Sequence, residues 1–127
     1  MPANFVHLRL HSAYSLAEST LRIKSLSGLI ADDRQPAAAI TDTNNMFGAL
    51  EFATLASKAG IQPISGALLR VSVGSVEAEK RQYLIPLLVQ SEAGYQNLMY
   101  LISFAYECSD RFAGTPAIDW SVLEGRT

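Results

Sequence analysis

The sequence contains very little cysteine and histidine. Its 127 residues include one cysteine, Cys108, and two histidines, His7 and His11. A single cysteine excludes an internal disulfide framework and fits a reducing cytoplasm. Neither histidine is near Cys108 in the sequence, so we interpret this cysteine as a small apolar side chain and not as an activated nucleophile.

The chain also lacks an excess of positive charge and any long apolar run. It has 10 Lys and Arg against 12 Asp and Glu, and the basic residues are scattered. A free-standing nucleic-acid surface normally requires a basic stripe, so none is expected. The N-terminus has no signal-peptide pattern, and apolar stretches such as "YLIPLLV" are too short to span a bilayer. We therefore expect a cytoplasmic protein with no membrane partner.

Familiar catalytic motifs are missing: the sequence has no Gly-rich phosphate loop, CxxC, GxSxG or HExxH. What it does have is an apolar content of 49%, enough for a sizeable core in one domain. The apolar patterns predict strands that alternate with helices. The predicted strands are 5–10, 37–41, 61–73 and 83–90, the predicted helices are 23–30, 46–59 and 92–107, and a short helix is expected near Trp120.

Residues that start helices or interrupt strands refine this pattern. We expect Ser19 or Thr20 to cap the first helix, Asn44 or Asn45 the second, and Ser91 the third. The second helix has one apolar stripe at helical spacing, consisting of Met46, Ala49, Leu50, Ala53 and Ala56. Phe47, Phe52 and Leu55 lie off this stripe, so we expect the helix to be covered on more than one side.

Two prolines and a glycine bear on the later strands. Pro63 and Gly66 are expected to break the third strand. The fourth strand reads as buried, with Pro86 making an edge, a bulge or a bend. Strands that alternate with helices predict βα units and a mainly parallel sheet.

In such a fold the site lies at the carboxyl ends of the strands. Arg9, His11 and the loop that carries Glu18 follow the first strand, and Asp42 ends the second. Together, His11, Glu18 and Asp42 would supply one imidazole and two carboxylates, a set that can bind zinc or manganese. Arg9 opposes this, because a guanidinium is not a ligand and brings positive charge. The alternative interpretation of Asp42 is a turn or cap residue, and His7 is interpreted as structural.

Four stretches carry a resemblance to a known family. In order and spacing, "FVHLRLHSAYSL", "AAAITDTNNMFGALEF", "KAGIQPISG" and "GYQNLMYLIS" resemble the N-terminal part of bacterial replicative DNA polymerase III alpha subunits. That part is their PHP (polymerase and histidinol phosphatase) domain. The resemblance implies an α/β fold, namely part of a distorted (β/α)7 barrel with about four βα units. It also implies that residues 1–127 are the N-terminal part of an incomplete PHP domain, without the polymerase core.

The resemblance further implies a degenerate metal site. Metal-binding relatives carry up to three Zn or Mn ions at the strand ends, on ligands from several motifs. The matching positions here are Arg9, His11, Glu18, Asp42, Thr43, Leu68 and Leu84. Most of these residues are not metal ligands, so we expect no bound metal and no catalytic residues in this chain. We hypothesise that Arg9 replaces the metal charge and hydrogen-bonds Asp42 or Glu18; the alternative is that Arg9 only extends into solvent at the rim.

The resemblance gives two functional hypotheses. The first is a structural PHP scaffold of a DNA-directed DNA polymerase, a nucleotidyltransferase in DNA replication, that contacts the rest of the polymerase chain and docks the proofreading exonuclease subunit. The second is a metal-dependent phosphoesterase or 3′–5′ exonuclease. Half a barrel also leaves open sheet edges, which predicts self-association.

Overall fold

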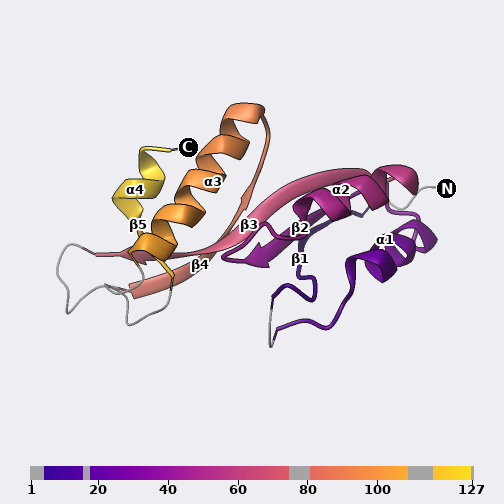
Figure 1. Ribbon diagram of the computed structural model, residues 1–127, viewed down its shortest axis with the longest axis horizontal. Coiled ribbons are helices and arrows are strands. Elements are labelled where there is room, and N and C mark those ends of the chain that lie inside the picture. Colours follow the sequence, from indigo (N-terminus) through magenta and orange to yellow (C-terminus); the bar gives the residue numbers. More distant parts are fainter. Residues whose placement is uncertain (1–4, 16–17, 75–80, 109–115, 127) are drawn as a thin grey trace.

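A five-stranded mixed sheet forms the centre of the computed structural model, which describes residues 5–15, 18–74, 81–108 and 116–126 (Figure 1). Four strands lie in the order β1-β2-β3-β4, and β5 also pairs with β3. The strands are β1 (His7–Leu10), β2 (Ala37–Thr43), β3 (Gln62–Val73), β4 (Arg81–Leu88) and β5 (Ile118–Asp119). The helices are α1 (Ile23–Asp32), α2 (Ala49–Lys58), α3 (Glu92–Glu107) and α4 (Trp120–Glu124). Among the described helices, none is long and apolar enough to cross a membrane.

The predicted mostly parallel sheet with helices is confirmed, and the sheet curls into a half-barrel. β1 pairs parallel with β2, β2 with β3, and β3 with β5. One step differs from the predicted alternation, because β4 pairs antiparallel with β3, the described strand that precedes it in the chain. A parallel crossover needs a dozen or more residues. Residues 74–80 are too few for that, so the chain turns back as a hairpin.

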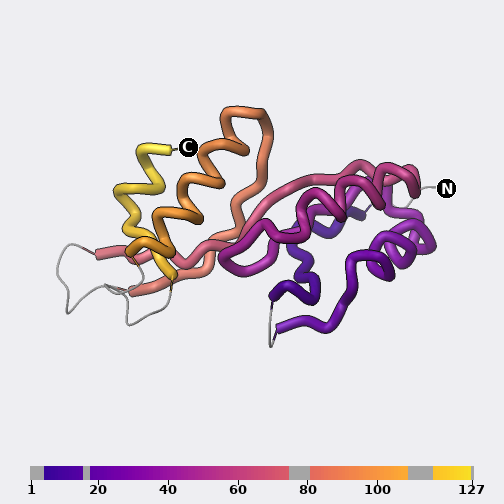
Figure 2. Tube along the Cα trace, viewed as in Figure 1, coloured from indigo at the N-terminus to yellow at the C-terminus, as the bar shows by residue number. Residues whose placement is uncertain are grey.

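Two hydrophobic cores lie along the length of β3. The first packs α1 and α2 on β2, with Phe52 fully buried at its centre. The second packs α3 and α4 on β3 and β5, around Leu69, Val71 and Leu101. Figure 2 shows β3 continuing through both halves of the molecule, with α1 and α2 towards one end and α3 and α4 towards the other. One strand therefore joins the two cores.

The predicted stripe of α2 is buried only in part. Ala56 of the stripe is buried, and so is Phe52 from outside it, whereas Leu50 is 80% exposed. The predicted asparagine caps are also wrong, since Gly48 precedes the helix as its cap. Both asparagines serve the turn after β2 instead. Asn44 has a φ of 55° and donates its N–H to the Leu68 carbonyl at 2.9 Å.

Of the caps predicted for the other two long helices, one is correct and one is wrong. Ser91 caps α3 as expected, and its hydroxyl oxygen accepts from the Gly94 N–H at 3.1 Å. α1 begins after Arg22 with no side-chain cap, so the predicted Ser19 or Thr20 cap is wrong. The Ser19 hydroxyl instead donates to the His11 carbonyl at 2.8 Å. It therefore stabilises the loop before the helix.

β3 runs unbroken through Pro63 and Gly66, which corrects the predicted interruption. Gly66 is required there by a close approach and not by a turn. A Cβ at this position would lie 2.5 Å from the Leu87 carbonyl oxygen of β4. The absence of a side chain allows the two strands to pair at this point.

We predict opposite effects on stability for two glycine-to-alanine changes. Gly66→Ala should lower the free energy of unfolding by about 1–3 kcal/mol, because the added methyl overlaps a backbone oxygen that cannot move freely. Gly28→Ala in α1 meets nothing within 4 Å and should raise it by up to about 1 kcal/mol through helix propensity. Urea unfolding of both variants measures the difference, and equal stabilities would contradict the close approach.

The fourth strand is exposed, not buried as predicted, and it lies at an edge. Leu84 and Leu88 are 40% and 38% exposed. The N–H of Val89 donates to the Ser65 carbonyl, so Val89, Leu87 and Ile85 direct their backbone groups at β3. Pro86 therefore stands at a position that faces the open edge. Its missing N–H costs no bond to β3 and interrupts the row of donors, which limits pairing with another chain.

We expect Pro86→Val to increase self-association through the β4 edge. The change restores an outward N–H and adds a residue that favours strands. Light scattering over a range of protein concentrations should show a higher mass than for the wild-type chain. Gln82→Val, on the same edge, adds a similar side chain without a new donor and serves as the control. An equal increase in both variants would mean that hydrophobicity, not edge pairing, is responsible.

Candidate functional site

The candidate site is built around Asp42, one residue before the end of β2. Side chains alternate along a strand, so Asp42 continues the row of Ala38 and Ile40, which pack in the first core. Asp42 is only 1% exposed. The loop after β1 closes over it and supplies its partners.

Three donors from that loop satisfy both oxygens of the Asp42 carboxylate. The Ser12 N–H donates to Oδ1 at 2.6 Å, and the Ser12 hydroxyl donates to Oδ2 at 2.7 Å. The Ser15 hydroxyl donates to Oδ1 at 2.7 Å. We call Ser12, Ser15 and Asp42 the serine–aspartate cluster. It ties the segment after β1 to the end of β2, as its members are 27 and 30 residues apart in sequence.

His11, Glu18 and Thr43 form the rim of this cluster. The Thr43 hydroxyl donates to Glu18 Oε2 at 2.7 Å, and the His11 Nδ1 atom lies 3.8 Å from the same oxygen. His11 Nδ1 is also 3.3 Å from Ser15 Oγ. The Ser15 hydroxyl already donates to Asp42 and accepts the Thr43 N–H at 3.0 Å. Ser15 is therefore fully used as a hydrogen-bonding bridge and is not poised as a nucleophile.

Asn45 fixes the turn that follows the cluster. Its amide nitrogen donates to the carbonyls of Tyr14 and Thr43, at 3.2 and 3.1 Å, and its oxygen accepts the Phe47 N–H at 3.3 Å. The loop after β1 and the turn after β2 are thus joined a second time. Next to this joint, the exposed rings of Tyr14 and Phe47 meet edge to face, with centroids 6.2 Å apart.

The predicted pairing of Arg9 with Asp42 or Glu18 is wrong. Arg9 lies on β1 and is exposed. Within the described residues it makes no hydrogen bond or ion pair with either carboxylate. The serine hydroxyls and the Ser12 N–H satisfy the Asp42 charge, so a guanidinium is not needed there.

The remaining predicted site positions lie at different distances from the cluster. Leu68 is fully buried in β3, paired in register with Thr43 at the edge of the site. Leu84 lies on β4, where it pairs with Arg70 of β3. It is 40% exposed and lies away from the cluster. His7 also lies elsewhere: its N–H donates to Gln35 at 3.1 Å, and its ring contacts Phe5.

The cluster offers poor ligands for a divalent cation. Both Asp42 oxygens are already hydrogen-bond acceptors, and Leu68 fills the adjacent position with an apolar side chain. Across the part of the chain that the structure describes, no group of three or more His, Cys, Asp or Glu residues could hold a metal ion. The predicted trio of His11, Glu18 and Asp42 does meet in one network, but as a hydrogen-bonded connection and not as a coordination sphere.

Sequence reasoning missed the roles of Ser12 and Ser15. Both are buried and together replace a counter-charge for Asp42. The signal was present, because "HSAYS" places two hydroxyls directly after the first strand, next to the predicted carboxylate. What was missing is the curvature of the loop, which turns both hydroxyls in the same direction.

We predict that Asp42→Ala lowers the free energy of unfolding by roughly 2–4 kcal/mol, because it leaves buried donors without an acceptor. Asp42→Asn should cost less, since its oxygen still accepts from Ser12 and Ser15. Glu18→Ala is the control at the exposed rim and should change stability by less than about 1 kcal/mol. Chemical unfolding curves measure all three, and an Asp42→Ala loss no larger than that of Glu18→Ala would contradict the structural role.

Comparison with known proteins places this geometry in a family. The PHP domain profile matches residues 7–127. The chain is 42% identical over 120 residues to the DNA polymerase III subunit alpha of Caulobacter vibrioides, a match that covers 92% of this chain. It is 46% identical over 103 residues to the protein of the same name from Pseudomonas fluorescens, covering 81% of this chain. The chain spans only about a tenth of the length of these relatives: 10% and 9%.

Solved structures agree on the fold. A putative metal-dependent phosphoesterase from Bifidobacterium adolescentis aligns with a TM-score of 0.59 at 14% identity, over 87% of this chain and 36% of that one. An amidohydrolase from Chromobacterium violaceum aligns with a TM-score of 0.56 at 22% identity, over 81% of this chain and 34% of that one. From the sequence match over residues 7–127 and the shared fold, the chain belongs to the PHP domain family.

Proposed function

We propose that this chain is a structural PHP scaffold of a replicative DNA polymerase III alpha subunit and is not itself catalytic. The observation that supports this most directly is the state of Asp42, whose two oxygens are occupied by donors from Ser12 and Ser15. A carboxylate used in this way fastens two loops together. It is not free to hold a metal or to accept a proton from a substrate.

The alternative function, a metal-dependent phosphoesterase or 3′–5′ exonuclease, makes a different demand on the same residues. Metal-assisted hydrolysis of a phosphodiester uses metal ions to activate water and to stabilise the leaving oxygen. The ligands would have to come from His11, Glu18 and Asp42, with Thr43 and Leu68 beside them. The Thr43 hydroxyl already donates to Glu18, and the Leu68 side chain has no atom that can bind a metal. We therefore propose that the chain binds neither zinc nor manganese.

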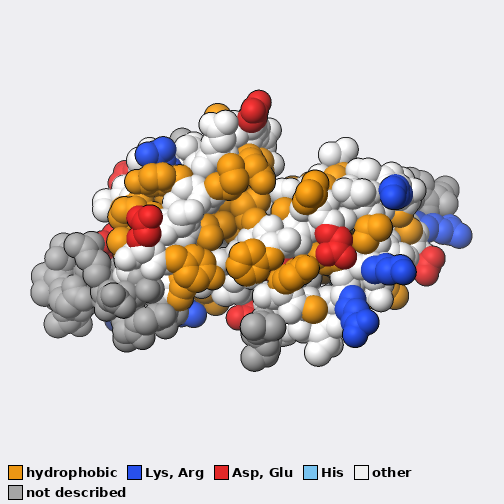
Figure 3. Space-filling model, in the orientation of Figure 1, with side chains coloured by type: hydrophobic (Ala, Val, Ile, Leu, Met, Phe, Trp, Pro, Cys, Tyr) orange, Lys and Arg blue, Asp and Glu red, His pale blue; other side chains and the backbone are white. Residues whose placement is uncertain are grey.

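The scaffold would act in the cytoplasm through protein contacts, without binding nucleic acid itself. Its partners in this proposal are the rest of the polymerase chain and the proofreading exonuclease subunit. Exposed apolar side chains support such a role. Figure 3 shows hydrophobic side chains spread over one face of the molecule. Exposed hydrophobic side chains on α3 and α4 include Met99, Tyr100, Tyr106 and Trp120, each 42–47% exposed.

A metal titration separates the two functions. We expect elemental analysis of the purified chain, and calorimetric titration with Zn²⁺ or Mn²⁺, to show no stoichiometric tight binding. The reason is that releasing Asp42 for a metal would break its bonds to both serines. The matched control is Asp42→Ala, which should give the same titration as the wild-type chain. Tight binding at a fixed stoichiometry that Asp42→Ala abolishes would overturn the scaffold proposal.

The docking role is tested by direct binding of the purified exonuclease subunit to this chain, measured by surface plasmon resonance. The proposal expects a saturable signal that does not depend on added metal. A signal that appears only when Zn²⁺ or Mn²⁺ is present would contradict it.

A further inference from the structure

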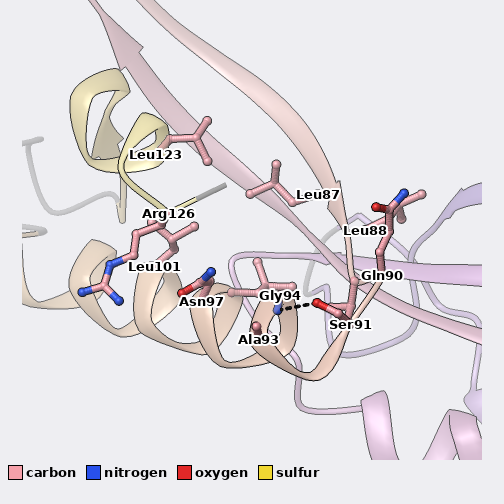
Figure 4. A pocket seen from close by; sticks show the side chains of 12 residues that line it. Leu87, Leu88, Gln90, Ser91, Ala93, Gly94, Asn97, Leu101, Leu123 and Arg126 are labelled. Atoms are coloured by element: carbon pink, nitrogen blue, oxygen red, sulfur yellow. Dashed lines mark hydrogen bonds between the residues drawn. The ribbon is translucent and has the colours of Figure 1, made fainter.

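The two faces of the hairpin of β3 and β4 differ in what covers them. Side chains alternate across a strand, and Ile85, Leu87 and Val89 of β4 pack against the second core. Figure 4 shows Leu87 on this covered side, where it faces Leu123 of α4. The side chains between these three residues therefore lie on the opposite face of the sheet, outside both cores.

That opposite face of β4 is apolar and exposed. It carries Leu84, Pro86 and Leu88, and the two leucines are 40% and 38% exposed. A Cβ on Gly66 would lie 3.0 Å from Leu88 Cδ2, so Leu88 extends across β3 on this side. An antiparallel sheet with one covered face normally directs polar side chains to water on the other. A row of three exposed apolar residues is instead typical of an interaction surface.

Arg70 brings a positive charge to the same face. It pairs in register with Leu84, and residues paired in this way share a face. Its neighbours on this side of β3 are Leu68 and Ser72, which are both buried. Arg70 itself is half-buried, and its Nε atom is buried with no hydrogen-bond partner. We call Arg70, Leu84, Pro86 and Leu88 the hairpin face.

The described part of the chain supplies no counter-charge for Arg70. Asp119 of β5 pairs in register with Ser72 on this face, but among the described residues the ion pair found joins His11 and Glu18, not Asp119 and Arg70. A guanidinium stays protonated and can only donate. Holding it half-buried without an acceptor costs free energy. A carboxylate from another molecule would remove that cost, because it can accept two bonds from one guanidinium.

We propose that the hairpin face docks a segment of a partner polypeptide that lays apolar side chains on Leu84, Pro86 and Leu88 and pairs a carboxylate side chain with Arg70. The charge selects this occupant over a second copy of the chain. A two-fold interface sets the same patch against itself, so it would bury two Arg70 cations together without a carboxylate. This inference goes beyond the proposed scaffold role, which does not depend on this face.

The spacing of the face sets the spacing in the partner. Alternate residues of a strand are about 7 Å apart, so an extended segment matches the face when its acidic and apolar residues alternate with others. The probes are therefore acetyl-Glu-Ser-Leu-Ser-Leu amide and the peptide of reversed sequence, which allow for either chain direction. Two control peptides of each sequence carry glutamine in place of the glutamate, or serine in place of both leucines.

The first experiment titrates these peptides into the full 127-residue chain and follows it by NMR. We expect the glutamate probe of at least one direction to shift the amide signals of Leu84 and Leu88 and the Nε–Hε signal of Arg70. It should bind about threefold to fivefold more tightly than the glutamine control, the range expected for an exposed ion pair. The serine control should bind more weakly than both.

Two pairs of variants assign the effect to the hairpin face. Arg70→Met should remove the preference for glutamate, and Arg81→Met, on the covered side of the same hairpin, should keep it. Leu84→Ser should weaken binding of the glutamate probe, and Tyr83→Ser, again from the other side of β4, should not. Arg70→Met should also raise the midpoint of urea unfolding relative to Arg81→Met, because it removes a half-buried charge without a partner.

Four results would overturn the inference. They are a preference for glutamate that persists in Arg70→Met, equal binding of the leucine and serine peptides, no binding of either probe direction, and a lower urea midpoint for Arg70→Met, which would mean that the chain already satisfies this charge. Light scattering addresses a second copy as the occupant. If Leu84→Ser lowers the mass found for the wild-type chain, another copy covers the face and the proposed partner is wrong.

The metal titration separates this inference from the proposed function. Asp42 pairs in register with Ala67, so it lies on the face of the sheet opposite to Arg70. Tight metal binding that Asp42→Ala abolishes would overturn the scaffold role, and the peptide preference of the hairpin face would still stand. No metal binding together with no peptide binding would leave the scaffold role in place and overturn the docking face.

Discussion

The buried carboxylate of Asp42 is the constraint on which the N-terminal half of the structure depends. A buried charge is tolerated only when hydrogen bonds replace its lost water, and here three donors from one loop do so. Those bonds set the path of the chain after β1, which in turn brings His11 and Glu18 to the rim. The site is thus a consequence of satisfying one charge. This explains why it is a connected polar network with no free coordination positions.

β3 provides the second organising element, because it pairs with β2 of the first core and contributes its own side chains to the second. Its first half pairs with β2, and its second half pairs with β5 on one side and β4 on the other. Gly66 lies where pairing with β4 begins, at a position with no room for a side chain beside the Leu87 carbonyl. The half-barrel is therefore a continuous structure, although each core has its own helices.

The sequence predicted what depends on local pattern. The strands around β1 and β2, the long α3 with its Ser91 cap, and the position of Asp42 at a strand end all follow from periodicity and capping chemistry. The errors arose where tertiary contacts decide. Leu50 and Phe52 are both compatible with a buried helical face, and only packing against β2 selects Phe52. Pairing of Arg9 with a carboxylate was plausible by charge, but the loop had already supplied hydroxyls to Asp42. Direction was missed for β4, since an apolar run does not indicate parallel or antiparallel pairing.

The hairpin of β3 and β4 has a consequence for the order in which the fold assembles. Its two strands are separated by only residues 74–80, so closing that loop costs little chain entropy. The parallel pairs need whole helices between their strands, which makes their contacts more distant in sequence and slower to form. Among the pairings of β3, the hairpin therefore costs the least chain entropy and is the expected folding nucleus. Once formed, it presents the free side of β3 as a template on which β2, and then β1 with its serine loop, can align.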